Sequence, residues 1–138
     1  MLKVVLDTNV LVSSLLSSKG SPAKILDLIL DNQILVAYDD RVLGEYEDVL
    51  SRPELHINPS RALAVIDHIE VSGHYIEAEA LPTEGYTDLD DIVFAEVFIT
   101  SQAEALISGN LRHYKPLLQQ NMLVLTPAQF MERFFPGL

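Results

Sequence analysis

The chain alternates short, continuous apolar runs with longer amphipathic stretches, and this alternation limits its fold more than any other feature. Five apolar runs are expected to be strands: residues 3–6, 34–37, 75–78, 105–107 and 122–125. Runs that are apolar throughout, rather than at every second position, are typical of parallel strands buried on both faces. The sequence therefore predicts an α/β fold, a sandwich of helices around a mostly parallel sheet of roughly five strands.

Capping residues and prolines mark where the intervening helices begin. Pro22, Pro59 and Pro127 each stand at a position suited to a first helical turn, and Asp39 or Asp40 is expected to cap the helix that follows the second strand. With 138 residues, 49% of them hydrophobic, the chain can bury one core without disulfides. Residues 1–138 are therefore expected to form a single domain.

Composition excludes several classes of protein. The chain has no Cys, which excludes a disulfide framework, a thiolate metal site and a cysteine nucleophile. Apolar runs are far shorter than the roughly 18 residues that span a bilayer, so a cytoplasmic protein without membrane contact is expected. Twenty acidic residues against nine Lys and Arg give a net charge of −11. Any nucleic-acid partner must therefore be held locally or through bound cations.

Acidic and amide side chains recur near the predicted strand ends. Asp7 directly follows the first strand, Asn110 follows the fourth, Asp90 and Asp91 begin the helix before that strand, and Glu45 lies in the helix after the second. Ligands of parallel sheets bind at the carboxyl ends of the strands, so these side chains are expected to converge. Clustered carboxylates repel unless a hard divalent cation binds between them. This pattern predicts Mg²⁺ or Mn²⁺ and phosphodiester hydrolysis.

The same residues carry a family resemblance. Asp7 lies in Val4-Val5-Leu6-Asp7-Thr8-Asn9-Val10, which is similar to the opening of a PIN domain. Four further segments resemble later PIN motifs in the same order: residues 42–53, 88–91, 105–110 and 124–130. The resemblance covers essentially the whole chain. It implies a small α/β/α sandwich and a metal-dependent endoribonuclease that acts on RNA.

The resemblance also implies partners. PIN domains similar to this one, the VapC-like ribonucleases, are very often the toxin of a toxin–antitoxin pair. A small cognate antitoxin would then block the acidic cleft by inserting a basic side chain. Similar PIN domains commonly form homodimers, which would merge two halves of an RNA-binding surface.

Site residues follow from the matched motifs. Asp7 and Asp91 match the principal metal ligands of the family, and Glu45 matches its helical acid. Asp90 adds a carboxylate beside Asp91, and either of the two can point inward. Asn110 completes the implied catalytic set.

Supporting roles are implied for neighbouring residues. Thr8 or Asn9 would orient the first carboxylate, and Ser108 fits the small hydroxyl position of the fourth motif. Arg112 and Lys115 follow this motif closely and are candidates for binding RNA phosphates.

One position departs from the pattern. The most similar PIN subgroup usually has Asp where this chain has Asn110. The substitution removes one negative charge, so a second metal ion is less favoured and affinity for the first should fall. Low activity or a preference for Mn²⁺ is therefore expected.

Alternatives remain at this point. Asn110 and the net charge of −11 favour a catalytically weak PIN-like module that binds RNA or a protein. A response-regulator receiver also gathers acids at strand ends, but no acidic pair follows the first strand here. Structural roles compete too: Asp90 and Asp91 suit a helix N-terminus, and Glu45 resembles the solvated acids beside it.

Overall fold

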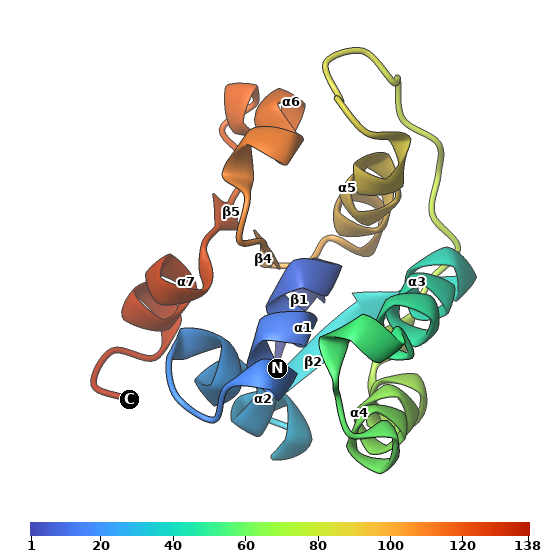
Figure 1. Cartoon of the computed structure of the whole chain (residues 1–138). Coiled ribbons are helices and arrows are strands. Elements are labelled where there is room, and N and C mark those ends of the chain that lie inside the picture. The colour runs from blue at the N-terminus through green and yellow to red at the C-terminus, as the bar shows by residue number, and fades with distance from the viewer.

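A computed structural model describes residues 1–138, which form a five-stranded sheet between layers of helices (Figure 1). The strands are β1 (Leu2–Leu6), β2 (Ile34–Tyr38), β3 (His74–Tyr75), β4 (Ala105–Ile107) and β5 (Val124–Leu125). All neighbours are parallel, and their order is β3-β2-β1-β4-β5. The predicted α/β sandwich with a parallel five-stranded sheet is thus confirmed.

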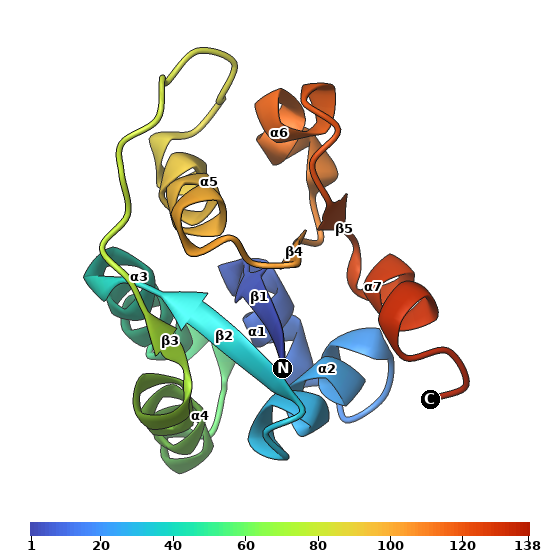
Figure 2. The ribbon, with the colours of Figure 1, turned by 180° about the vertical axis from the view of Figure 1, so that it is seen from behind.

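The helices lie on both sides of this sheet. Their bounds are α1 (Thr8–Leu16), α2 (Ser21–Leu30), α3 (Asp40–Leu50), α4 (Pro59–Ser72), α5 (Leu89–Ser101), α6 (Lys115–Gln119) and α7 (Pro127–Phe134), with 3₁₀ turns η1 (Pro53–Leu55) and η2 (Leu111–Tyr114). Right-handed crossovers that proceed from β1 towards β3 require helices on one face, and the return towards β5 requires them on the other. Figures 1 and 2, which are opposite views, show α1 on one side of β1 and α5 on the other.

The sheet centre is the most deeply buried part of the core. Val4 in β1 pairs with Val36 in β2 and with Ala105 in β4. Val4, Ala105 and Leu106 have no exposed surface, and Val36 is 1% exposed. The continuous apolar strands therefore belong to a sheet covered on both faces, as their composition indicates.

Several elements differ from the sequence-based expectation; β5, for example, covers Val124–Leu125 instead of residues 122–125. The third strand is His74–Tyr75 instead of residues 75–78: the Ile76 amide donates to the Tyr38 carbonyl at 2.9 Å, and the chain then leaves the sheet. Helix α1 was not expected, because its β-branched and Ser-rich sequence has weak helical propensity. Buried Val10, Leu11, Ser14 and Leu15 recur at helical spacing, which is the signal that identifies this helix.

The topology places functional side chains at one edge. Asp7 follows β1, Asp39 follows β2 and Ser108 follows β4, and parallel strands bring these carboxyl ends to the same edge of the sheet. Helix α5 begins after the N-cap Asp88. No helix in the chain is long and apolar enough to cross a membrane.

Candidate functional site at the carboxyl edge of the sheet

Asp7 is the most firmly held acid of this edge. It is 6% exposed, and its Oδ2 accepts hydrogen bonds from Ser108 Oγ at 2.8 Å and Tyr114 Oη at 2.9 Å. Asn9 Nδ2 adds a longer bond, 3.3 Å, to the same oxygen. Three donors, one from α1 and two from the region after β4, therefore fix Asp7 Oδ2. The other carboxylate oxygen, Oδ1, accepts no hydrogen bond from the protein. Buried Tyr114 is a supporting residue that the motifs did not identify.

Glu45 faces Asp7 from α3. Thr8 Oγ1 donates to Glu45 Oε2 at 2.7 Å, so Thr8 holds this helical acid and does not bond the Asp7 carboxylate. Burial raises the pKa of the Glu45 carboxyl; the Thr8 bond opposes this rise, and the charges of Asp90 and Asp7 add to it. The Thr8 bond therefore places Glu45 beside the end of β1, next to Asp7.

Asp91, rather than Asp90, is the inward-facing acid of α5. Asp91 is 8% exposed, whereas Asp90 is exposed. Asp91 Oδ2 is the one buried side-chain oxygen of the chain without a hydrogen-bond partner, although His113 Nδ1 lies 3.2 Å away. Burial raises the pKa of Asp91 to about 6; the His113 charge lowers it, and the charge of Asp7 raises it.

Asn110 is bonded to the same imidazole. The side-chain Nδ2 of Asn110 lies 2.8 Å from His113 Nε2, and the backbone N–H of Asn110 donates to Ser108 Oγ at 3.0 Å. His113 therefore lies between Asn110 and Asp91. Sequence spacing gave no reason to select His113; its place in the 3₁₀ turn η2, three residues after Asn110, brings it back to the site.

Oxygen donors dominate the site, which suits a hard divalent ion rather than zinc. No three acidic or His side chains stand close enough together to enclose a metal ion. Even so, the unpartnered Asp91 oxygen and the raised pKa values of Asp91 and Glu45 mark a place that lacks positive charge. The donor set thus fits a hard divalent ion in its chemistry.

Only a few basic side chains lie near this edge. Arg112 and Lys115, in η2 and at the start of α6, are exposed, and neither forms an ion pair. Arg41 is engaged by Asp39 and Glu96, both at 2.8 Å. Arg112 and Lys115 are therefore the bases near Asn110 that remain available to a ligand.

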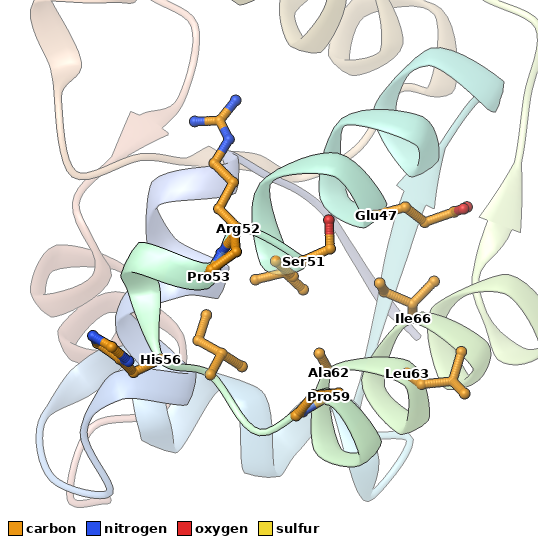
Figure 3. A pocket seen from close by; sticks show the side chains of 11 residues that line it. Glu47, Ser51, Arg52, Pro53, His56, Pro59, Ala62, Leu63 and Ile66 are labelled. Atoms are coloured by element: carbon orange, nitrogen blue, oxygen red, sulfur yellow. The ribbon is translucent and has the colours of Figure 1, made fainter.

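A cavity of about 490 Å³ lies elsewhere, between the end of α3, η1 and the start of α4 (Figure 3). Leu50, Ile57 and Ile66 form its apolar floor, and Arg52 and His56 lie at its rim. None of the predicted site residues lines it. The predicted acidic side chains lie at the sheet edge, so we place the candidate functional site there and not in this cavity.

Comparison with known proteins identifies the family. A family model described as PIN domain matches residues 3–112. The chain belongs to the PIN domain family. The matched region contains every acid of the sheet-edge site, so the PIN resemblance noted from the motifs is confirmed.

Two further similarities extend over most of the chain. Uncharacterized protein MJ1680 of Methanocaldococcus jannaschii is 31% identical to this chain, and the match covers 96% of this chain and 92% of that protein. The crystal structure of VapBC2 from Rickettsia felis, bound to a DNA fragment from their promoter, is similar in fold: the TM-score is 0.60 at 19% identity, over 91% of this chain and 98% of that chain.

Proposed function

We propose that this PIN domain is a metal-dependent endoribonuclease that hydrolyses phosphodiester bonds of RNA in the cytoplasm. The observation that carries the proposal is the placement of Asp7, Glu45 and Asp91 at one edge of the sheet, where Asp7 and Asp91 are buried and Glu45 is bonded to the residue after Asp7. Each acid comes from a different element, and hydrogen bonds hold Asp7 and Glu45 in place. Family membership adds support, because PIN domains are typically nucleases.

Asp7 and Asp91 are the residues that would hold the divalent ion directly, and Glu45 would hold it through a water molecule. When bound, Mg²⁺ or Mn²⁺ lowers the pKa of a water molecule and neutralises charge on the phosphoryl group. The chain itself supplies orientation: Ser108 and Tyr114 fix one oxygen of Asp7 and leave the other free for ligation. Rigid placement of this kind lowers the reorganisation needed at the moment of reaction.

Glu45 is the candidate proton acceptor. Thr8 occupies Oε2, and Oε1 accepts no hydrogen bond from the protein. Burial raises the pKa of Glu45 above its ordinary value, which brings this carboxylate closer to the proton affinity that a general base needs at neutral pH. We therefore assign Oε1 as the atom that takes the proton lost by the attacking water.

The toxin role belongs to the same proposal. The fold resembles that of VapBC2, a complex named for both of its components, and this supports a small cognate antitoxin as the partner of this chain. A basic antitoxin side chain would be attracted by the acids around Asp91. We further propose a homodimer, which would place two exposed basic edges beside one RNA.

The test is cleavage of a mixed-sequence RNA with Mg²⁺, Mn²⁺ or EDTA. Asp7→Asn can keep the three hydrogen bonds through its amide oxygen while removing the ligating charge, so activity is expected to fall at least about 100-fold. Asp27→Asn, at an exposed position in α2, is the matched control and should cleave like the wild type. Cleavage that persists in EDTA, or in Asp7→Asn, would overturn the proposal.

A second function is favoured by one observation. The Asn110 side chain is engaged by His113, so the fourth acidic position of similar PIN domains is filled here by a residue that adds no charge. A PIN module that binds RNA or protein without cutting is the corresponding alternative. RNA binding by a folded protein that shows no cleavage with either metal would establish it.

A further inference from the structure

A small polar cavity adjoins the acidic site on the side of α1. It has a volume of about 280 Å³ and is lined by residues of α1, the start of α2, the loop after β4 and the start of α7. Asn9 and Asn110 form the walls nearest the acids, and Asn9 also bonds to Asp7. A group in this cavity would therefore be next to whatever occupies the acidic site.

The cavity is built by a close contact between two strand-edge segments. The Gly109 amide donates to Asn9 Oδ1 at 2.9 Å. A Cβ atom at Gly109 would lie 3.2 Å from the same oxygen, so glycine permits this approach. The contact fixes the side-chain amide of Asn9 between the cavity and Asp7. The position of the cavity wall therefore depends on the position of the Asp7 carboxylate.

The lining has no charge, although the chain as a whole carries −11. It contains none of the acids that line the cavities near Glu47 and near Asp39. Ser13 Oγ and Asn110 Oδ1 accept or donate no hydrogen bond within the protein, so both are available to a ligand. Absence of any cationic side chain argues against a phosphate, and neutral amide and hydroxyl groups suit the edge of a base.

We propose that this cavity binds one nucleobase of a single-stranded RNA, directly beside the phosphodiester bond that is cut. The proposal rests on the nuclease function proposed above and adds a base preference at one position. Asn110 Oδ1 and Ser13 Oγ contact the edge of the base, while Pro22 and Pro127 form rigid apolar walls. At about 280 Å³ the cavity is at the small end of ligand sites, which suits a single base.

The experiment measures nucleotide binding in EDTA, so that it does not depend on catalysis. Amide signals of isotopically labelled protein are followed by NMR during titration with each of the four 5′-nucleoside monophosphates, and with inorganic phosphate as reference. We expect one nucleotide to shift the signals of Gly109 and Asn110 more than the others, and inorganic phosphate to leave them unchanged. Equal shifts with phosphate, or none with any nucleotide, would overturn the proposal.

Variants at exposed positions separate the cavity from the rest of the surface. Ser13→Phe fills the cavity and should weaken nucleotide binding at least about tenfold, which is the loss expected when one base can no longer bind. Ser13→Ala should keep binding but reduce the preference among bases. Ser60→Phe, an equal change at an exposed serine of α4, should alter neither. Unchanged binding by Ser13→Phe would contradict a base in this cavity.

Sequencing of RNA cleavage ends separates the two proposals. Cleavage without preference at any position, together with absent NMR shifts, would overturn the base site alone. Shifts that Ser13→Phe abolishes, together with absent cleavage, would overturn the nuclease function and retain the base site.

Discussion

Asp91 combines a functional position with an unfavourable environment. Burial raises its pKa from 3.8 to about 6, so between these values the folded protein keeps a proton that the unfolded chain releases. Linkage then requires stability to fall as pH rises through this window. Asp91→Asn cannot ionise, and at pH 7.5 in EDTA it should be more stable than the wild type by about 1–2 kcal/mol. The prediction is checked by thermal melting between pH 4 and pH 8.

The control for this experiment is the neighbouring acid. Asp90→Asn changes an exposed side chain and should shift the free energy of unfolding by less than about 0.5 kcal/mol at any pH. A wild type whose stability rises from pH 4 to pH 6 relative to Asp91→Asn would contradict the assignment of a strained, buried carboxylate.

Position 110 affects the net negative charge of the site, because Asn110 is neutral where similar PIN domains usually have Asp. Asn110→Asp adds a carboxylate beside His113 and Asp91, which should tighten Mn²⁺ binding about tenfold and lower the melting temperature in EDTA. Isothermal titration calorimetry measures the first effect and thermal melting the second. Gln33→Glu, at an exposed position before β2, is the matched amide-to-acid control. Equal Mn²⁺ affinity in wild type and Asn110→Asp would place Asn110 outside the metal-binding set.

At the scale of elements, the apolar composition of short runs predicted the central strands of the sheet. The bounds of β4 match the expectation, and those of β1 and β2 differ by one residue at one end, because each strand is apolar throughout. The edge strand β3 was displaced, because only two residues pair and both are exposed. Helix α1 was missed because tertiary burial outweighs the weak propensity of its residues.

Local composition could not reveal pairings between distant elements. The motifs located Asp7, Glu45 and Asp91, but Tyr114 reaches Asp7 from 107 residues away, and His113 reaches Asp91 from η2. No spacing rule connects residues that meet only after the sheet has formed. The orienting role of Thr8 towards Glu45 depends likewise on the packing of α1 beside α3.

The segment between β3 and α5 is held by a buried acid. Glu96 in α5 is 5% exposed; it accepts from Arg41 Nη1 and from the Leu81 amide, both at 2.8 Å. Glu96→Gln leaves one of these donors facing an amide NH₂ group. Because Arg41 is partly solvated, we expect a loss of about 1–2 kcal/mol in the free energy of unfolding.

Urea denaturation measures this loss. Glu79→Gln, on the same segment but exposed, serves as control and should change the free energy of unfolding by less than about 0.5 kcal/mol. A loss in Glu79→Gln as large as that in Glu96→Gln would show that the Arg41 and Leu81 contacts are not what holds the segment.

For the whole molecule, the net charge of −11 opposes the approach of RNA. Arg112 and Lys115 are exposed and free of ion pairs next to the site, so they should supply most of the local attraction. Replacing both by Gln should raise KM for RNA several-fold with little change in kcat, because phosphate contacts position the strand without entering the chemistry. Arg61→Gln, on an exposed part of α4, removes one positive charge far from the site in sequence and is the control.

The salt dependence of RNA binding tests the same idea independently. Each phosphate contact with a single strand contributes a slope of about −0.7 to log K against log [salt], so two contacts predict about −1.4, a shallow dependence for a nucleic-acid-binding protein. The double variant should approach zero slope, whereas Arg61→Gln should retain the wild-type value. A steep slope that survives the loss of both bases would mean that RNA follows a different basic surface, such as one completed by a second copy of the chain.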